Sequence, residues 1–410
     1  MRRIFHVDMN SFFASCEVAR NNDLKDKHIA VAGDPSARHG IILAASYSAK
    51  AYGIKTTMPI WKALKLCPDL IVLPVDFELY REYSYKFMEI LREYAPVIEQ
   101  ASIDEAFLDL TGTEKLYPDL YDLAKLIQDR ILNELGLSCS IGISENRLLA
   151  KMGSDFKKPL GITQLYIEDV KEKMWPLDVG DLLFVGKSTT ESLKSIGIYT
   201  IGDLANYDEE NLANYFGEKG ARRLIESANG IDDSEVIPNE EIEVKSNGAE
   251  KTFSQDIDDI DILKNELFEF SIRIAKNLRE LNKKSKTIVL KIKYDNFVSI
   301  TRNFTLNKAT DSQNEIYENG CMLLDNNWDS EKKVRLIGLS CTNFSEEEND
   351  IEQLTLFENA EEDIEKEEQK EIKNEKYKKL DMLMDKLEDK FGNQVLMKAK
   401  SLKNKGDNNE

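Results

Sequence analysis

Acidic residues stand within or directly after strand-like segments in the first part of the chain, and this placement constrains the fold more than any other feature. The apolar run Arg3–Val7 ends at Asp8. The run Val97–Leu110 has the composition of one strand and carries Asp104 and Glu105 in its middle. A strand that ends in a carboxylate is an arrangement that active sites often use. We therefore expect a functional site on a sheet that contains both runs.

Helix-like and strand-like segments are mixed through the first 166 residues. Leu137–Ile143 is a third strand candidate, rich in β-branched and small residues. Apolar spacing predicts helices over Phe77–Tyr94 and Pro118–Leu135, the second beginning with proline where a helix tolerates it. This mixture predicts an α+β multidomain protein built around a mixed sheet.

The composition is that of a globular protein with several domains. The chain has 410 residues, 41% of them hydrophobic, and contains no apolar run of 18 residues. Met1 and two arginines lead directly into a strand-like run, which is unlike a signal peptide. We expect a cytoplasmic monomer that does not contact a membrane.

The cysteines do not form a recognisable framework. Five are scattered along the chain, without a Cys-x-x-Cys pair, and there are only three histidines. Neither disulfides nor a zinc site is expected. A bound metal should have oxygen ligands, as Mg²⁺ does.

The charge is strongly negative but unevenly distributed. The net charge is −20. Residues 346–372 contain 13 acidic residues and two lysines, whereas residues 273–308 contain ten basic residues and two acidic ones. This asymmetry is typical of a nucleic-acid-binding body with an acidic tether.

Two features after about residue 170 favour contact with DNA. Gly186 and Gly197 punctuate short helical patterns on either side of Leu193, which resembles a helix-hairpin-helix whose turn offers amides to phosphate. An ordinary helical turn explains the same pattern. After a linker-like stretch at Ser234–Lys245, the segment Thr287–Tyr294 alternates apolar residues with lysines, as in a half-buried strand that lies against DNA.

Adjacent carboxylates admit two interpretations. A solvated surface pair is the plainer one for Asp104 and Glu105. Their apolar flanks weaken that interpretation without replacing it. The other interpretation is a metal site for phosphoryl transfer, in which two cations about 3.5–4 Å apart are held by carboxylates. Neighbours on a flat strand point to opposite faces, so Glu105 would have to reach the site from a twisted hairpin, with Asp104 bridging the metals beside Asp8.

Three segments taken together carry a family resemblance. They are Asp8–Glu17 (DMNSFFASCE), Ala45–Lys50 (ASYSAK) and Ser102–Ala106 (SIDEA). In order and spacing they resemble Y-family DNA polymerases of the DNA polymerase IV class, and the likeness extends to about residue 345. It implies a low-fidelity, template-directed translesion polymerase that lacks proofreading and uses two Mg²⁺ ions, dNTPs and primer-template DNA.

The resemblance implies roles for individual residues near the metals. Asp8 and Asp104 would bind both ions, Glu105 would complete the primer-side site, and the carbonyl group of Met9 would face the nucleotide-side ion. Phe13 would be the steric gate that excludes a ribose 2′-hydroxyl. A simple core position, like that of Phe12, is the alternative role for Phe13.

It also implies contacts with the triphosphate, by Tyr47, Lys50 and Lys158. Lys50 departs from the family pattern, which usually has arginine, and so loses a bidentate fork. Asn10, where an acidic residue is frequent, and Arg147, where lysine is usual, are two further departures.

The same resemblance divides the chain into the parts of a right hand. They are a palm at 1–10 and 77–166, small fingers at 11–76, a helical thumb with a helix-hairpin-helix at 167–233, a linker at 234–243, an α/β little finger at 244–345 and an acidic tail at 346–410.

The tail holds an apolar island within its acidic run, formed by Gln353, Leu354, Leu356 and Phe357. It resembles the peptide with which bacterial polymerases bind the sliding clamp; a chance hydrophobic cluster is the alternative. An apolar stripe from Tyr377 to Phe391 predicts a further helix near the C-terminus.

Two other functions compete with a polymerase. A nucleotidyl cyclase also uses two metals on such a sheet, but it has no need of the hairpin, the basic strand or the clamp peptide. A non-catalytic protein that binds DNA and the clamp has no need of the three carboxylates.

Overall fold

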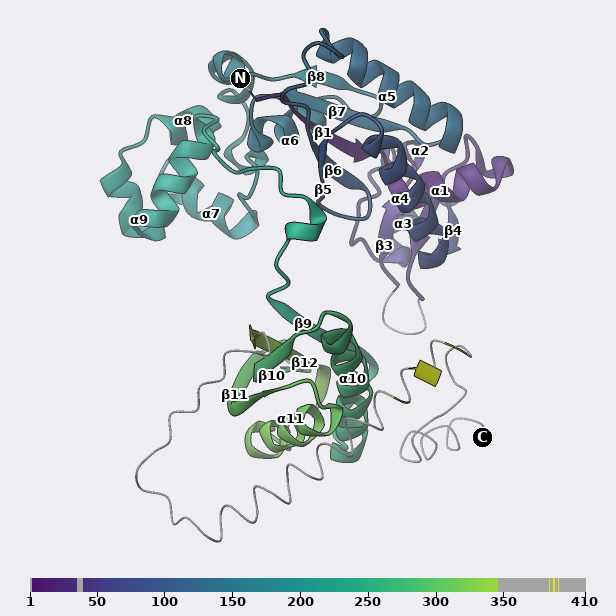
Figure 1. Cartoon of the computed structure of the whole chain (residues 1–410), viewed down its shortest axis with the longest axis vertical. Coiled ribbons are helices and arrows are strands. Elements are labelled where there is room, and N and C mark those ends of the chain that lie inside the picture. The colour runs from purple at the N-terminus through teal and green to yellow at the C-terminus, as the bar shows by residue number, and fades with distance from the viewer. Residues whose placement is uncertain (1, 35–39, 346–382, 384–385, 388–389, 391–410) are drawn as a thin grey trace. The chain divides into compact units, whose positions relative to one another are not determined.

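The computed structural model describes residues 2–34 and 40–345, with four further residues (383, 386, 387 and 390) near the C-terminus. It contains two compact units, Met1–Ile242 and Glu243–Glu410 (Figure 1). The predicted clamp-binding peptide and nearly all of the predicted C-terminal helix lie outside the described residues. Within the described part, no helix has both the length and the apolar character needed to cross a membrane.

A five-stranded sheet with helices forms the centre of the first unit (Figure 1). Its elements are β1 (Ile4–Met9), α4 (Phe77–Arg92), β5 (Val97–Gln100), β6 (Glu105–Asp109), α5 (Leu120–Leu135), β7 (Cys139–Ser144), α6 (Arg147–Phe156) and β8 (Ile162–Gln164). The strand order is β5-β6-β1-β7-β8. Strand β1 is antiparallel to β6 and β7, whereas β8 runs parallel to β7.

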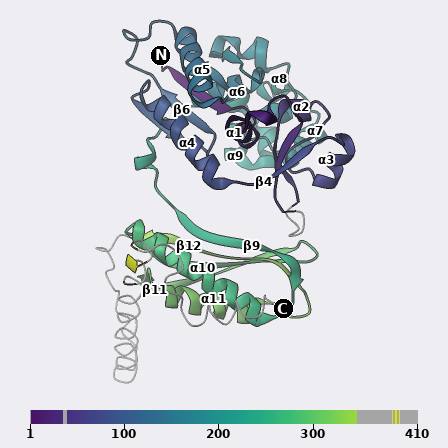
Figure 2. The same cartoon turned by 90° about the vertical axis from the view of Figure 1, so that its right-hand side faces the viewer.

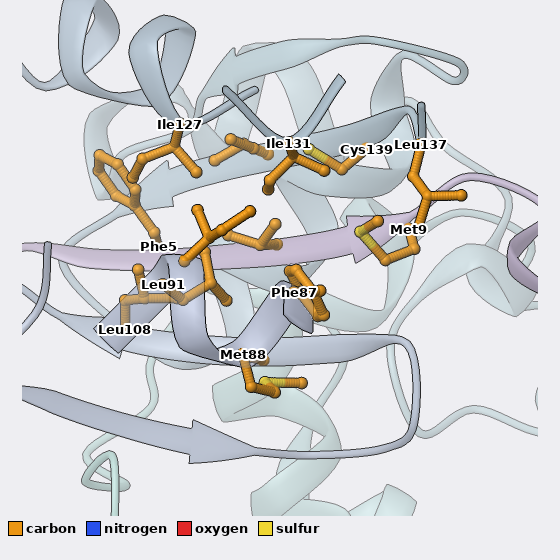
Figure 3. Packing of buried hydrophobic residues seen from close by; sticks show 14 of the residues in the cluster. Phe5, Met9, Phe87, Met88, Leu91, Leu108, Ile127, Ile131, Leu137 and Cys139 are labelled. Carbon is orange, nitrogen blue, oxygen red and sulfur yellow. The ribbon is translucent and has the colours of Figure 1, made fainter. Parts of the chain in front are cut away.

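The two faces of β1 have different neighbours. Phe5 on one face packs with Leu91 of α4 and Ile131 of α5 in the largest buried cluster (Figure 3). Because side chains alternate along a strand, His6 and Asp8 point to the opposite face, where α6 lies. The sheet therefore has an apolar face against α4 and α5, whereas the face toward α6 combines the apolar Ile4 and Phe107 with the polar His6 and Asp8.

Side-chain caps fix where the two long helices begin. The carboxylate of Asp76 accepts a hydrogen bond from the amide of Leu79, and that of Asp119 accepts one from the amide of Asp122. Helix α5 ends at Gly136, whose φ of 68° suits glycine. Both helices were predicted, with ends that differ by at most two residues.

The prediction of one strand over Val97–Leu110 is wrong. The segment is a hairpin of β5 and β6, in which Gln100 pairs with Ala106. In the intervening turn the amides of Ala101 and Ser102 donate to the carbonyl group of Glu105, at 3.1 and 3.2 Å. The hydroxyl of Ser102 also accepts a hydrogen bond from the amide of Asp104 at 3.2 Å. These hydrogen bonds within the turn take the place of the inter-strand hydrogen bonds that a continuous strand would make.

A smaller three-stranded sheet follows β1 in the chain. Its elements are α1 (Phe12–Arg20), the 3₁₀ turn η1 (Asn22–Leu24), β2 (Ile29–Ala32), β3 (Ile42–Ala45), α2 (Tyr47–Lys50), α3 (Ile60–Leu66) and β4 (Ile71–Pro74). The strand order is β3-β2-β4, with β2 antiparallel to β3 and parallel to β4. Ala30 and Ile42 form a buried cluster with Ala63 of α3.

Residues 167–228 form a series of helices that are short, as predicted, except for the last one, which has 20 residues. They are η3 (Ile167–Asp169), η4 (Val170–Met174), η5 (Val179–Asp181), α7 (Lys187–Ser195), α8 (Ile201–Ala205) and α9 (Glu209–Ala228). Gly186 caps the start of α7, and Gly197 follows it with a φ of 87°. Leu193 between them is fully buried. A Cβ atom at either glycine would meet nothing within 4 Å, so both turns leave their backbone open.

The segment after α9 lies along the first unit up to η6 (Asn239–Glu241). The guanidinium of Arg2 donates to the carbonyl groups of Asp233 and Ser234, at 3.3 and 3.1 Å. Arg147 donates to the carbonyl group of Glu235 at 2.7 Å. This part of the expected linker is therefore anchored by two arginines of the first unit.

The second unit is a four-stranded antiparallel sheet with two helices (Figure 2). Its elements are β9 (Ser246–Ile257), α10 (Ile260–Glu280), β10 (Lys284–Tyr294), β11 (Ser299–Thr310), α11 (Gln313–Asn327) and β12 (Val334–Ser345). Ile288, Leu290 and Ile292 of β10 are buried with residues of both helices. Lys291 and Lys293 alternate with them and are partly exposed, as the sequence predicted.

Candidate active site

Strand pairing brings the predicted carboxylates together in the middle of the five-stranded sheet, where β1 ends and β6 begins. Asp8 lies directly opposite Glu105 in the antiparallel pair of β1 and β6. Residues opposite each other in such a pair project to the same face. The amide of Met9 donates to the carbonyl group of Asp104 at 2.9 Å, which places the turn beside the end of β1.

The hairpin solves the geometric problem of two adjacent carboxylates. Asp104 lies in the turn and Glu105 is the first residue of β6. They are therefore not neighbours on one flat strand, where their side chains would point to opposite faces. The hydroxyl of Ser102 donates to Asp104 Oδ1 at 2.7 Å and fixes that carboxylate within the turn. The three carboxylates do not form one compact ligand group in the described structure. Instead, Asp8 and Glu105 each direct an oxygen atom toward a lysine.

Lys158 is the partner of Asp8. Its ammonium group lies 2.7 Å from Asp8 Oδ1 and 2.9 Å from Asp155 Oδ1. Burial raises the pKa of Asp8 above its usual range, and the charge of Lys158 opposes this rise. Burial alone would lower the pKa of Lys158, but the two carboxylates outweigh it and raise the pKa.

Glu105 has two partners that sequence reasoning missed. Glu105 Oε2 lies 2.5 Å from the ammonium group of Lys151 and 3.4 Å from Nε2 of His6. Hydrogen bonding to His6, followed by that to Lys151, lowers the pKa of Glu105 to about 2 despite partial burial. The ring of His6 is fully buried, which lowers its own pKa, and its Nδ1 lies 2.8 Å from the hydroxyl of Ser154. Glu105 is therefore ionised and held in one orientation.

A second network fixes the chain where it leaves β1. The amide nitrogen of the Asn10 side chain donates to the hydroxyl of Ser140 at 3.0 Å, and its oxygen accepts from the amide of Leu160 at 2.9 Å. A carboxylate could not serve as both donor and acceptor. Asn10, the residue that departs from the family pattern, is thus part of a buried hydrogen-bond network.

Aromatic residues lie behind the start of α1. The ring of Phe13 is stacked on that of Tyr80, with centroids 4.3 Å apart, and meets the edge of Phe77 at 6.1 Å. Tyr80 is fully buried and its hydroxyl donates to Glu17 Oε1 at 2.8 Å. Phe12, by contrast, is itself buried in the core. Phe13 is partly exposed, so the two neighbouring phenylalanines have different environments.

The predicted triphosphate contacts come from α2 and from the segment after α6. The ammonium group of Lys50 lies 4.5 Å from the centre of the Tyr47 ring and donates to the hydroxyl of Ser11 at 2.8 Å. Burial lowers the pKa of Lys50, and the charge of Lys158 lowers it further. The structure therefore brings Tyr47, Lys50 and Lys158 close to Asp8.

The donor set of the site suits a hard divalent cation. Asp8, Asp104 and Glu105 offer carboxylate oxygens, and the end of β1 offers the carbonyl group of Met9. Oxygen ligands of this kind are those that Mg²⁺ prefers. The ammonium groups of Lys151 and Lys158 lie beside Glu105 and Asp8 and offset part of their negative charge.

Comparisons with known proteins agree with this geometry. Three protein-family models match: the impB/mucB/samB family over residues 7–155, its C-terminal domain over 244–356, and the IMS family HHH motif over 168–198. The chain is 45% identical over 402 residues to DNA polymerase IV of Clostridium kluyveri, covering 98% of each chain. It is 40% identical over 402 residues to DNA polymerase IV 1 of Bacillus subtilis, covering 98% of this chain and 94% of the relative.

A solved structure has the same fold. A Y-family DNA polymerase chimera superposes with a TM-score of 0.74 over 84% of this chain and 99% of its own, at 24% identity. The fold is thus the multidomain α+β right hand of a polymerase, with a helix-hairpin-helix at the glycine turns that the sequence indicated.

Fold and relatives together define a DNA-directed DNA polymerase of the translesion class. Within that class the chain belongs to the impB/mucB/samB family of Y-family polymerases, with relatives named DNA polymerase IV along nearly its whole length. The nucleotidyl cyclase alternative is thereby excluded.

Proposed function

We propose that the chain extends a DNA primer by two-metal nucleotidyl transfer, with Asp8, Asp104 and Glu105 as the metal-holding residues. The observation that supports this most directly is the register of β1 and β6, which sets Asp8 opposite Glu105 beside the turn that carries Asp104. The names of the relatives, which describe a DNA polymerase, agree with this arrangement.

Asp8 and Asp104 would hold both Mg²⁺ ions, with Glu105 on the primer side and the carbonyl group of Met9 on the nucleotide side. When bound, such a pair activates the primer hydroxyl and stabilises the leaving pyrophosphate. The residues of the chain keep the ligands ionised and oriented: Lys151 fixes Glu105, and Lys158 offsets the effect of burial on Asp8.

Tyr47, Lys50 and Lys158 would bind the triphosphate of the dNTP. Their grouping around Asp8 supports this role, since it collects two ammonium groups and one phenol beside the proposed metals. Phe13 would lie under the sugar, with Tyr80 behind it.

The parts of the hand have separate proposed roles. The helix-hairpin-helix at 167–233 and the lysine-bearing sheet at 244–345 would hold primer-template DNA through its phosphates. We propose that the monomer lacks proofreading and is recruited by the sliding clamp through Gln353, Leu354, Leu356 and Phe357. Tethering of this kind would raise the local concentration of the polymerase at the primer end.

Primer extension with purified protein, Mg²⁺ and dNTPs tests the proposal. We expect extension by the wild type and none by an Asp104→Ala, Glu105→Ala double variant. Asp109→Asn, on the same strand and the same face as Glu105, is the matched control and should extend normally. If the wild type binds DNA yet extends no primer, the chain is a non-catalytic recruitment protein instead.

A further inference from the structure

A second cluster of metal-binding side chains lies in the three-stranded sheet, outside the candidate active site. His28, Cys67 and Asp69 each offer one ligand atom, and these atoms all lie within 4.8 Å of one another. The three residues are separated by up to 41 positions in the sequence. The numbers of cysteines and histidines did not predict this group, because its residues come together only when the strands of the sheet pair.

Backbone pairing holds the three residues in place. Strands β2 and β4 are parallel, with Ile29 opposite Ile71, and the amide of Ile71 donates to the carbonyl group of His28 at 2.8 Å. His28 therefore lies at the start of β2, next to the turn that leads into β4. In that turn the amide of Leu70 donates to the carbonyl group of Cys67 at 3.1 Å. The cluster is thus built on a rigid sheet edge and does not depend on a long loop.

The side chains retain bonding capacity that the described residues do not use. His28 Nε2 lies 3.7 Å from Asp69 Oδ2, beyond hydrogen-bond distance, and His28 Nδ1 is buried without a partner among the described residues. The ring is kept in place by an edge contact with Tyr52, at 4.8 Å between centroids. The thiol of Cys67 is buried and donates to Asp69 Oδ1 at 3.1 Å. An imidazole, a thiol and a carboxylate thus converge, and the ring nitrogens make no hydrogen bond within the part of the chain that the structure describes.

We propose that His28, Cys67 and Asp69 bind a Zn²⁺ ion, with the fourth position open to water. Thiolate, imidazole and carboxylate are the ligand types that zinc takes in tetrahedral sites, whereas Mg²⁺ avoids sulfur and nitrogen. On binding, the thiol of Cys67 gives up its proton to solvent as the Zn–S bond forms. Asp69 is largely exposed, which gives the ion a path from solvent.

Bound zinc would join the end of α3 to the starts of β2 and β4. Cys67 follows α3 directly, and its amide donates to the carbonyl group of Ala63 within that helix. The ion would therefore stabilise the sheet that follows β1, by binding the folded form in preference to the unfolded chain. This inference does not rest on the proposed polymerase mechanism, because none of its ligands belongs to the carboxylate site.

Spectroscopy of the Co²⁺-loaded full-length chain tests the site. A thiolate ligand produces a sulfur-to-cobalt charge-transfer band that oxygen ligands at Asp8, Asp104 or Glu105 cannot give. We expect the band in the wild type and in Cys321→Ser, the matched control in the second unit, and its loss in Cys67→Ser. Titration with Zn²⁺ should abolish the band at one equivalent per chain.

A second, milder variant keeps the proposal testable even when Cys67→Ser does not fold. Asp69→Asn changes one exposed oxygen ligand and should keep the fold and the Mg²⁺-dependent extension, while the Kd for Zn²⁺ rises by about tenfold or more, since even outer-shell changes cost about 10–100-fold. A cobalt band that persists in Cys67→Ser, or equal Zn²⁺ affinity in the wild type and Asp69→Asn, would overturn the proposal. Failure of primer extension alone would bear only on the polymerase mechanism.

Discussion

The ring of Tyr80 lies stacked on the ring of Phe13, with 4.3 Å between centroids and 13° between planes. Tyr80 is itself fixed, because its hydroxyl donates to the buried carboxylate of Glu17, which also pairs with Arg20 at 2.5 Å. In the proposed role as steric gate, Phe13 would be unable to retreat into the core when a larger sugar enters. A rigid backing of this kind is what a steric gate needs.

Replacing the gate should admit ribonucleotides. In Phe13→Ala the clash with a 2′-hydroxyl disappears. Overpacking of this type costs about 1–3 kcal/mol, so we expect ribonucleotide incorporation to rise about 5- to 160-fold relative to dNTPs. Single-nucleotide extension with rNTP and dNTP measures the ratio. Tyr85→Phe, at an exposed tyrosine of the same helix, is the control and should keep the discrimination. Unchanged sugar discrimination in Phe13→Ala would assign Phe13 to the core alone.

Sequence periodicity predicted the elements of this fold better than their connections. The helices α4 and α5 have clear apolar spacing and capping aspartates, so their ends were predictable within two residues. The hairpin at 97–110 was not, because its turn contains no glycine or proline. The bonds that Ser102 makes to Asp104 become visible only in three dimensions.

The candidate site shows the same limit. Motifs grouped Asp8, Asp104 and Glu105, and the structure has all three where β1 ends and β6 begins. Their role as metal ligands stays a prediction. The partners of Glu105 were missed, since Lys151 comes from a helix far along the chain and His6 looks like a strand residue. Contacts between distant segments depend on how α6 packs on the sheet, which no local pattern specifies.

Lys151 should act by holding Glu105 for the metal. In Lys151→Met the carboxylate loses the ammonium group that orients it, and changes to such supporting partners typically cost about 10–100-fold in metal affinity or activity. We expect a corresponding rise in the Mg²⁺ concentration needed for half-maximal extension. Lys151→Arg keeps the charge and should restore much of the affinity. An unchanged Mg²⁺ requirement in Lys151→Met would show that the 2.5 Å pair is only structural.

As the pH falls, protonation of Asp8 should weaken metal binding at a higher pH than protonation of Glu105 does. The pKa of Asp8 is raised by burial, whereas that of Glu105 is lowered to about 2, so as pH falls Asp8 takes up a proton first and loses its capacity as a ligand. Mn²⁺ binding followed by electron paramagnetic resonance measures the profile. Lys158→Met removes a charge that lowers the pKa of Asp8, so the acid limb should move to higher pH.

The exposed neighbour Lys157 provides the control for that experiment. Lys157→Met removes the same charge from the same segment but not the contact with Asp8, and its profile should match that of the wild type. Coincident acid limbs for Lys158→Met and the wild type would contradict a coupling between Lys158 and Asp8.

Lys50 offers a test of the departure from the family pattern. Its single ammonium group donates to Ser11 and lies over Tyr47. Arginine at this position could donate two hydrogen bonds to phosphate, and one additional hydrogen bond contributes about 1 kcal/mol, or about fivefold in affinity. Steady-state insertion kinetics of Lys50→Arg should therefore show a lower KM for dNTP. A KM equal to that of the wild type would show that Lys50 already makes the full contact.

The clamp peptide can be tested independently of the active site. Deleting residues 353–357 should leave extension without clamp unchanged, because none of the proposed metal or triphosphate residues is touched. Stimulation by a sliding clamp should fall by about two orders of magnitude, the lower end of what tethering contributes. A Leu356→Ala, Phe357→Ala variant should reproduce the loss, whereas Asn359→Ala, just outside the apolar island, should not. If the deletion leaves clamp-stimulated product length unchanged, the island is a chance cluster, and recruitment has to come from another surface of the chain.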